Sequence, residues 1–233
     1  MATIRRAHIG DLDSIGAVLS DVWEERLLVD TASTALDDGL ASIWVAEQGD
    51  LVVGFASGFQ TVGLDDVPRW EVDLLAVLPE YQCLGLGRGL IEAIWADGLA
   101  LNAAYARALL RADNLPAQRA FAAAGYTSDR RKYQLFLWSP VDADEPGMQI
   151  PLGVGLVPVD TLTYRGLWIE GLEPQRMGPD TQRAVVEAAR VQAGREDRFN
   201  TGALIPAAQE RFLAPDLRTI AALQGTYHWW VRR

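Results

Sequence analysis

The sequence predicts a mixed α/β protein of the α+β class, in which a mostly antiparallel sheet is flanked by helices. Runs rich in β-branched and aromatic residues alternate with segments whose apolar residues recur at helical spacing, and tight turns separate several of these runs. Residues 139–151 then shift to Pro, Asp, Glu and Gly, a composition typical of a linker. We therefore expect a first domain over residues 1–138, a linker over 139–151 and a smaller C-terminal α/β lobe over 152–233.

The first half of the first domain is expected to combine two helices with four strands. Asp11 or Asp13 can cap a helix after the opening strand, because Asp is a favoured N-cap residue. The turn Gln48-Gly49-Asp50 joins two β-rich runs into a hairpin, and a third β-rich run follows. The expected elements are a strand over Thr3–Arg6, a helix through Ile15, Val18, Leu19 and Val22, a weaker helix over 31–40, and strands over Ile43–Glu47, Leu51–Phe59 and Trp70–Leu78.

After residue 82 the period changes, and helices alternate with strands. Gly125 is a typical helix stop at the end of the second of these helices. The expected elements are a glycine-rich turn over Gln82–Gly89, a helix through Leu90, Ile91, Ile94 and Trp95, a strand over Arg107–Arg111, a helix over Leu115–Ala124 and a strand over Tyr133–Trp138. In the C-terminal lobe we expect strands over 163–171, 200–205 and 227–231 and helices over 181–193 and 207–214.

The composition excludes several classes of function. Acidic residues outnumber basic ones, 31 to 21, for a formal net charge of −10, and the basic residues form no cluster of the size that a nucleic-acid partner requires. A single cysteine, Cys83, excludes a disulfide framework and a Cys-rich zinc site, and His8 and His228 are too isolated to indicate a metal site. The sequence has no apolar run of about 18 residues and no apolar N-terminal segment. We therefore expect no membrane span and a cytoplasmic location.

The most informative segment is the glycine-rich turn between the third β-rich run and the following helix. Glycines at positions 85 and 87 allow close backbone approach, and amides at a helix N-terminus bind phosphate, so the turn suits a pyrophosphate. The dinucleotide fingerprint fails because its sixth position is Leu90, and the P-loop fails because Gly87 is followed by Arg88-Gly89. The pattern that fits is Gln82-x-x-Gly85-x-Gly87.

This pattern resembles the acyl-CoA loop of the GNAT superfamily of N-acetyltransferases. A second segment, Asn114-x-x-Ala117-x-x-x-Phe121-x-x-x-Gly125-Tyr126, resembles the family's Asn-x-x-Ala-x-x-x-Tyr-x-x-x-Gly-Phe with two aromatic exchanges. The resemblance covers residues 1–138 and implies acetyl-CoA as acyl donor. It implies cofactor contacts from backbone groups of Leu75, Ala76 and Val77, from the loop residues Gln82, Cys83, Leu84, Gly85, Leu86, Gly87 and Arg88, and from Asn114, Ala117 and Phe121.

Each of these assignments has a structural alternative. Asn114 precedes Leu115-Pro116 and can simply cap a helix, a role compatible with cofactor binding. Cys83 lies in the loop without any neighbour that marks it as a nucleophile.

Two carboxylates are candidates for the base that deprotonates the amine. Glu71 and Asp73 alternate along one strand and so project to the same face. Glu71, eleven residues before Gln82, matches the base position in the histone acetyltransferase branch of the family. Either residue can instead lie on a solvated strand end or bind substrate charge. The family's usual acid is a tyrosine, but this chain has Phe121 at that position. Three alternatives follow. The thiolate leaves without a protein acid, another tyrosine (Tyr81, Tyr126 or Tyr133) serves as the acid, or the protein binds acyl-CoA without turnover.

The preferred interpretation is an N-acetyltransferase that acts by direct transfer to a primary amine, on a small molecule or a peptide, in a ternary complex. The alternatives are a non-catalytic acyl-CoA-binding or regulatory module, and an interaction protein that forms a homodimer through the tryptophans of its tail.

The C-terminal lobe is interpreted as a degenerate GNAT-like half. Gln175-x-x-Gly178 repeats Gln82-x-x-Gly85, and Trp230 follows Gln175 by 55 residues much as Trp138 follows Gln82 by 56. The second glycine is replaced by Asp180 beside Pro179, which makes cofactor binding there unfavourable, and the alternative is an unrelated α+β tail.

Overall fold

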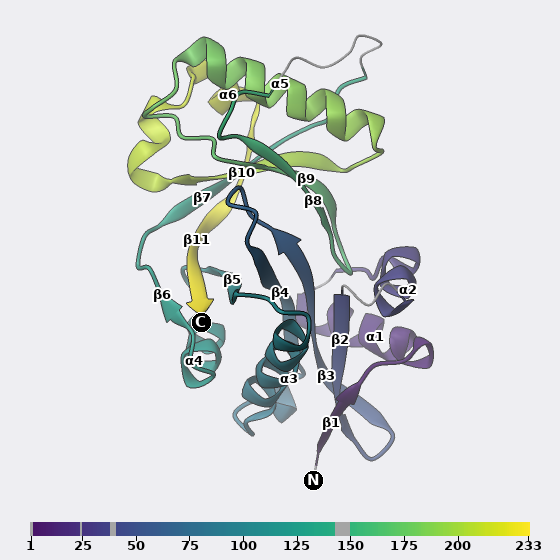
Figure 1. Ribbon diagram of the computed structural model, residues 1–233. Coiled ribbons are helices and arrows are strands. Elements are labelled where there is room, and N and C mark those ends of the chain that lie inside the picture. The colour runs from purple at the N-terminus through teal and green to yellow at the C-terminus, as the bar shows by residue number, and fades with distance from the viewer. Residues whose placement is uncertain (1, 24, 38–40, 143–149) are drawn as a thin grey trace. The chain divides into compact units, whose positions relative to one another are not determined.

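The computed structural model describes residues 2–23, 25–37, 41–142 and 150–233. The chain forms two compact units, and each contains both strands and helices (Figure 1). Unit 1 comprises Met1–Asp129, Thr161–Thr163 and Trp229–Arg233, and unit 2 comprises Arg130–Asp160 and Tyr164–His228. Both are mixed α/β with mostly antiparallel strand pairs, which confirms the predicted fold class.

Unit 1 is built on a sheet whose strands follow the order β1-β2-β3-β4-β5, with the end of β11 next to β5. Its strand pairs are antiparallel except β4 with β5, which run parallel. The strands are β1 (Thr3–Arg6), β2 (Ala41–Gln48), β3 (Leu51–Val62), β4 (Pro68–Val77), β5 (Tyr105–Arg111), β6 (Thr127–Ser128) and the last residues of β11 (Ala222–Arg232). The helices are α1 (Leu12–Trp23), α2 (Val29–Asp37), α3 (Leu86–Ala100) and α4 (Leu115–Ala123), with 3₁₀ turns η1 (Ile9–Asp11) and η2 (Pro79–Tyr81).

A bulge interrupts β4 in the middle of this sheet. Gly58 pairs with Val72 and Ala56 pairs with Leu75, so Ser57 on β3 is opposed by the two residues Asp73 and Leu74. The extra residue changes which side chains face which side of the sheet. Before the bulge Trp70 and Val72 face α3, whereas after it Leu75 and Val77 do so.

Helices cover both faces of this sheet. One hydrophobic cluster packs β4 against α3, with Trp70 wholly buried, and we call it the α3-side cluster. The other packs Phe55 of β3 against Ile15 and Leu19 of α1, and we call it the α1-side cluster. The helical spacing of Ile15, Val18 and Leu19 in the sequence predicted this second contact correctly, since all three are buried.

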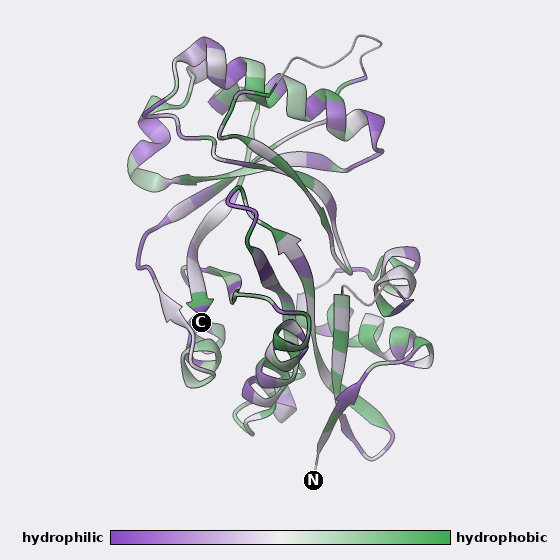
Figure 2. Ribbon diagram, in the orientation of Figure 1, coloured by the Kyte–Doolittle hydropathy of each residue, from purple (hydrophilic) through white to green (hydrophobic). Residues whose placement is uncertain are grey.

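Unit 2 contains a smaller sheet with the strand order β8-β9-β10-β7-β11. Strands β9 and β10 are parallel, and the other neighbours pair antiparallel. The elements are β7 (Tyr133–Trp138), β8 (Gly155–Asp160), β9 (Arg165–Glu170), α5 (Pro179–Arg195), β10 (Asn200–Pro206), the 3₁₀ helix η3 (Ala207–Phe212), α6 (Pro215–Ile220) and the first part of β11. In Figure 2, hydrophobic and hydrophilic residues alternate along α5, which buries Val185, Val186 and Ala189 against this sheet.

The two units do not coincide with the ranges expected from the sequence. Strand β7, which was expected to close the first domain, pairs with β10 from Thr201↔Trp138 to Pro206↔Tyr133 and belongs to unit 2. In exchange, Trp230 and Val231 at the end of β11 pair with Ser128 and Thr127 of β6 in unit 1. Most of the expected linker, residues 143–149, lies outside the described residues.

Two expectations for the C-terminal region need correction. The helix expected over 207–214 is the 3₁₀ helix η3, and a separate helix α6 begins at Pro215, a residue favoured at the first helical position because it lacks the N–H that goes unpaired there. Strand β8 was not expected, because Pro158 within it is a weak strand signal.

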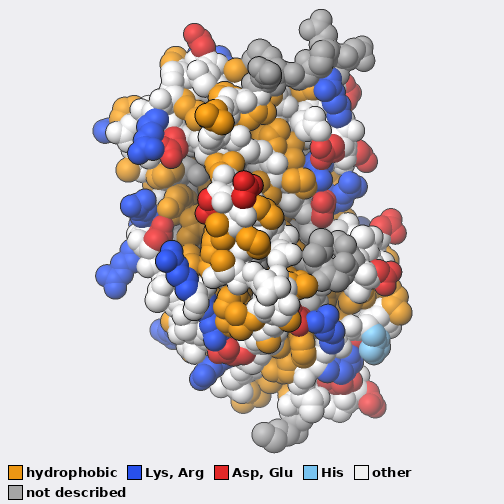
Figure 3. Space-filling view, in the orientation of Figure 1, with side chains coloured by type: hydrophobic (Ala, Val, Ile, Leu, Met, Phe, Trp, Pro, Cys, Tyr) orange, Lys and Arg blue, Asp and Glu red, His pale blue; other side chains and the backbone are white. Residues whose placement is uncertain are grey.

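On the face shown in Figure 3, basic side chains are interspersed with acidic ones. Within the described part of the chain, no helix is both long and apolar enough to cross a membrane.

Candidate active site

The parallel strands β4 and β5 separate beside the bulge. Their pairing ends at Val72↔Ala108, and beyond it the described partners of Leu75, Ala76 and Val77 lie on β3. The other edge of β4 therefore presents backbone N–H and C=O groups that an extended chain can join as an added strand. This edge contains the backbone groups that the sequence predicted as contacts of a pantetheine arm.

The loop that the sequence predicted to bind a pyrophosphate lies directly after this strand, at the start of α3. The chain leaves η2 through Cys83 and Gly85, both in the left-handed region with φ of 59° and 83°. Gly85 is the N-cap of α3 and supplies no side chain to cap it, so the first amides of the helix are left for another acceptor. Gln82 fixes the loop, because its Nε2 donates to the carbonyl oxygen of Val77 at 3.0 Å.

The loop, β4 and α4 come together at Gly87. A Cβ added at Gly87 would lie 3.9 Å from Cβ of Ala120 on α4 and 3.9 Å from Cδ2 of Leu75 on β4. The exposed guanidinium of Arg88 follows in the same turn of α3. The predicted loop residues Leu84, Leu86 and Arg88 therefore lie within one turn of this junction, with Leu84 exposed and Leu86 buried.

The second predicted segment forms α4. Asn114 is its N-cap and accepts a hydrogen bond from the amide of Ala117 at 3.1 Å, as the capping alternative expected. Phe121 is buried in the α3-side cluster and lies edge-on to Tyr126, with 5.0 Å between the ring centroids. The position where an acid was sought is thus wholly apolar.

The three tyrosines proposed as substitute acids differ in their surroundings. Tyr126 is buried, and its hydroxyl has no hydrogen-bond partner among the described residues. Burial raises the pKa of Tyr126, so it keeps its proton and is a poor acid. Tyr81 packs against the α3-side cluster, and Tyr133 belongs to unit 2.

Glu71 is fully engaged by hydrogen-bond donors. Its Oε1 accepts from Nε of Arg69 at 2.7 Å, from Nε of Arg107 at 2.8 Å and from the hydroxyl of Thr61 at 2.9 Å, and Nε of Arg107 also reaches Oε2 at 2.8 Å. The Arg107 guanidinium in turn stacks on the ring of Trp229 at 4.1 Å. Two guanidinium groups and one hydroxyl therefore hold this carboxylate, which links β3, β4 and β5.

Asp73, at the bulge, has very different neighbours. The Ser57 hydroxyl donates to its Oδ2 at 3.5 Å. Burial raises the pKa of Asp73 to about 7, and the nearby charges of Glu25 and Glu71 also raise it, whereas the hydroxyls of Thr161 and Ser57 lower it. A carboxyl with such a pKa can accept a proton at neutral pH and release it again.

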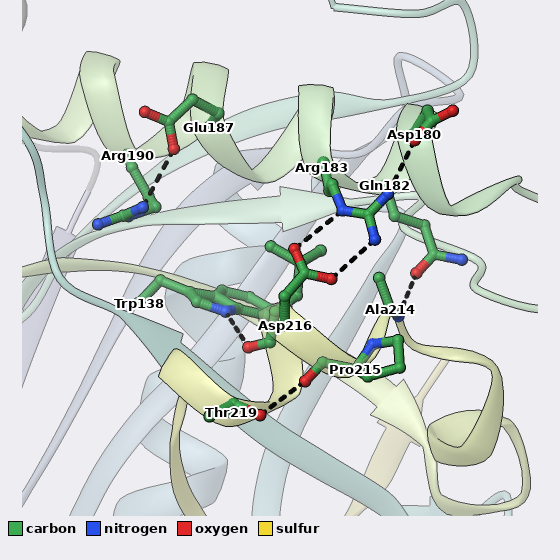
Figure 4. Close-up of polar contacts among 11 residues, drawn as sticks. Trp138, Asp180, Gln182, Arg183, Glu187, Arg190, Ala214, Pro215, Asp216 and Thr219 are labelled. Carbon is green, nitrogen blue, oxygen red and sulfur yellow. Dashed lines mark hydrogen bonds and ion pairs between the residues drawn. The ribbon is translucent and has the colours of Figure 1, made fainter.

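The corresponding loop of unit 2, before α5, is closed by its own side chains. Gln182 is 1% exposed, and its Nε2 donates to the carbonyl oxygens of Pro174, Met177 and Phe212. Its Oε1 accepts from the amide of Ala214 at 2.8 Å (Figure 4).

One ion pair links the two helices of unit 2 beside this loop. Arg183 on α5 pairs with Asp216 on α6 at 2.9 Å, and within α5 it also pairs with Asp180 at 2.8 Å (Figure 4).

A helix N-terminus without a side-chain cap lies beside two separating parallel strands, an arrangement that suits a phosphate-bearing cofactor with an extended arm. Residues 13–126 match the family described as acetyltransferase (GNAT) family. The chain therefore contains a GNAT acetyltransferase domain. This identification confirms the predicted acetyltransferase class and acetyl-CoA as its acyl donor.

Two solved structures resemble the chain over nearly its whole length. The glucosamine N-acetyltransferase region of a fungal multi-domain β-N-acetylglucosaminidase covers 100% of this chain at 13% identity, with a TM-score of 0.64. The chain spans only 38% of that protein. A GCN5-related N-acetyltransferase from Sphaerobacter thermophilus covers 99% of this chain and 95% of its own length, at 12% identity and a TM-score of 0.59. Among curated proteins, no sequence matches this chain.

Sequence reasoning missed two features of this site. The pairing of Glu71 with Arg69 had a local signal, because residues two apart on a strand share a face. The raised pKa of Asp73 had none, because it results from burial by segments that lie far apart in the sequence.

Proposed function

We propose that the protein is an N-acetyltransferase that transfers the acetyl group of acetyl-CoA directly to a primary amine, with both substrates bound at once. The observation that carries the proposal is the position of Asp73, a carboxyl with a pKa near 7 at the bulge where β4 and β5 separate. When bound, acetyl-CoA supplies a reactive thioester. The exposed edge of Leu75–Val77 would align its arm, and the first amides of α3 would hold its pyrophosphate.

In this proposal Asp73 is the general base. An amine in water is mostly protonated at neutral pH, and attack on a thioester requires its neutral form. Asp73 would take the amine's proton, and the hydroxyl of Ser57 would hold its carboxyl in place. Glu71, the other predicted base, would instead anchor the strands through Arg69 and Arg107.

The thiol leaving group would depart without a tyrosine. Phe121 cannot donate a proton, and Tyr126 is buried with a raised pKa. A free thiol has a pKa of about 8.5, so a thiolate is a moderately good leaving group without an acid.

The acceptor would be a small molecule or a peptide that carries a primary amine. The net charge of −10 favours a cationic acceptor over an anionic one.

The test is thiol release from acetyl-CoA across a library of small amines and peptides, with Asp73→Asn and Glu71→Gln as a matched pair. We expect Asp73→Asn to lower kcat by about 10²-fold or more while acetyl-CoA binding stays unchanged. Glu71→Gln should mainly lower the melting temperature. Full activity of Asp73→Asn would exclude Asp73 as the base. Loss of activity in Glu71→Gln alone, at unchanged stability, would indicate Glu71 as the base instead.

The second candidate function is a non-catalytic acyl-CoA-binding module. The apolar surroundings of Phe121 favour it, because they deprive the leaving group of an acid. Calorimetric binding of acetyl-CoA together with no thiol release for any amine in the library would support this alternative.

The third interpretation, a dimer formed through the tail's tryptophans, is not needed to explain these residues. Trp229 stacks on Arg107 and Trp230 packs against the α3-side cluster, so both rings already have partners within unit 1. The oligomeric state stays a prediction.

A further inference from the structure

Four side chains from four neighbouring strands form a row across the sheet of unit 1. The hydroxyl of Thr61 on β3 donates to Glu71 on β4 at 2.9 Å, and Nε of Arg107 on β5 donates to both carboxylate oxygens of Glu71 at 2.8 Å. The Arg107 guanidinium also lies over the ring of Trp229, at the end of β11, at 4.1 Å from its centroid. We call these four residues the cross-strand row.

The cross-strand row lies where β4 and β5 separate. Glu71 and Arg107 are direct partners in the parallel register of the two strands. The next pair, Val72↔Ala108, is the last one between them. Residues 75–77, which form the open edge of β4, follow a few positions later and pair with β3 on their other side. The ion pair of Glu71 with Arg107 therefore fastens β5 to β4 just before the strands diverge.

The two adjacent tryptophans of β11 contact opposite faces of this sheet. Ala106 and Ala108, the neighbours of Arg107 on β5, are buried in the α3-side cluster. Side chains alternate along a strand, so Arg107 and the Trp229 ring beneath it lie on the opposite face. Trp230 packs against the α3-side cluster itself. One tryptophan thus belongs to the cross-strand row, and its neighbour does not.

The ring of Trp229 stabilises the position of Arg107. The side chains of Arg107 and Glu71 are only 17% and 12% exposed, so water screens their attraction little. A cation over an aromatic face is held more strongly at such a shielded site than at an exposed one. Without the ring, one face of the guanidinium would be open to water, and Arg107 would leave Glu71 more easily.

We propose that Trp229 is a positioning residue for the arm of acetyl-CoA. By holding Arg107 against Glu71 it fixes β5 at the point where β4 separates from it, and so keeps the edge of residues 75–77 accessible to the arm. The inference rests on the proposed placement of the arm along this edge. It gives a residue near the end of the chain a role at the cofactor site.

The experiment compares the binding of two ligands to the full chain by calorimetry. One is acetyl-CoA, and the other is 3′-phospho-ADP, the portion of CoA that carries the pyrophosphate but no arm. Trp229→Leu removes the ring, and Trp230→Leu is the matched control on the opposite face. We expect Trp229→Leu to raise the Kd of acetyl-CoA by about three- to tenfold and to leave the Kd of 3′-phospho-ADP unchanged. Trp230→Leu should lower the melting temperature without changing either Kd.

Two further variants test the route through Arg107. Trp229→Phe keeps an aromatic face for the guanidinium, so it should restore most of the affinity for acetyl-CoA, and it provides a readout if Trp229→Leu fails to fold. Arg107→Gln should weaken acetyl-CoA binding in the same selective way. Adding Trp229→Leu to Arg107→Gln should raise the Kd no further, because both changes act through the same ion pair.

The outcomes separate this inference from the proposed function. Unchanged acetyl-CoA binding in Trp229→Leu overturns the positioning role, and so does an equal loss of affinity for both ligands, because the effect would then not concern the arm. A fully additive double variant overturns the route through Arg107. If the wild-type protein binds acetyl-CoA no more tightly than 3′-phospho-ADP, the arm gains nothing from the edge, and the proposed placement fails together with this inference.

Discussion

Asp73 and Glu71 lie two residues apart on β4 and have opposite surroundings. Glu71 accepts from two guanidinium groups, whereas Asp73 meets two hydroxyls and the charges of other carboxylates. The bulge at Asp73 and Leu74 places this second carboxyl where β4 leaves β5. Two carboxyls of the same strand can thus serve different purposes, one structural and one chemical.

The raised pKa of Asp73 makes a prediction about stability. Its pKa is about 7 in the folded protein and near 3.8 when unfolded, so between these values the folded state binds more protons and the free energy of unfolding falls as pH rises. Asp73→Asn removes this charge. We expect the variant to be more stable than wild type at pH 8, by roughly 1–3 kcal/mol, and to lose this advantage near pH 4.

Urea unfolding of both proteins at a series of pH values measures this difference. A variant that is less stable than wild type at pH 8 would contradict the burial of an ionised Asp73. Stability gained where activity is lost is the expected signature of a strained catalytic group.

The residues of the site were predictable to different degrees. Gln82, Gly85 and Gly87 stand out because a tight approach to phosphate requires glycines at fixed spacing before a helix. The choice between Glu71 and Asp73 was not predictable, because it depends on partners from β3, β5 and residues 161–163. Such contacts between segments distant in sequence carry no local signal.

At the scale of elements, periodicity predicted most strands and helices of unit 1, because each buries one face. The β4 strand and α3 are the strongest examples, with their apolar residues in the α3-side cluster. Periodicity did not predict which sheet β7 and the end of β11 would join. Backbone hydrogen bonding accepts either partner, so the choice rests on non-local packing.

The end of β11 should therefore be needed for the stability of unit 1. Removing residues 229–233 deletes the stacking of Trp229 on Arg107, the packing of Trp230 and the ion pair of Arg232 with Glu92 at 2.7 Å. We expect a loss of about 2–4 kcal/mol, since a partly buried Trp alone contributes much of this.

Thermal unfolding followed by tryptophan fluorescence and circular dichroism measures that loss. Deletion of the exposed Arg233 alone is the control and should leave the melting temperature unchanged. Equal melting temperatures for the longer deletion and wild type would show that these terminal contacts contribute nothing to unit 1.

At the scale of the whole molecule, the two units share an order of elements. In unit 1 β3, β4, α3, β5 and α4 follow one another, with β4 and β5 parallel. In unit 2 β8, β9, α5 and β10 are followed by η3 and α6, with β9 and β10 parallel. This correspondence supports the proposal that the C-terminal lobe is a degenerate GNAT-like half. The last strands depart from the expected ranges, because β7 belongs to unit 2 and the end of β11 belongs to unit 1.

The two loops differ in how well the first amides of the helix that follows can bind phosphate. The loop of unit 1 leaves the first amides of α3 without a side-chain cap, whereas in unit 2 Pro179 lacks an N–H and Asp180 adds negative charge at the start of α5. Gln182 also occupies the space beside the loop with its hydrogen bonds to Pro174 and Ala214. The whole chain should therefore bind one acetyl-CoA, in unit 1.

Calorimetry with acetyl-CoA tests this through one substitution in each loop, Gly87→Asp in unit 1 and Gly178→Asp in unit 2. Neither position is crowded, because a Cβ at Gly87 meets its nearest neighbours at 3.9 Å and one at Gly178 meets nothing within 4 Å. We expect a stoichiometry of one, a rise in Kd of more than about tenfold for Gly87→Asp from charge repulsion of the pyrophosphate, and no change for Gly178→Asp. Two molecules bound per chain, or weaker binding in Gly178→Asp, would mean that the loop of unit 2 retains the function of the first.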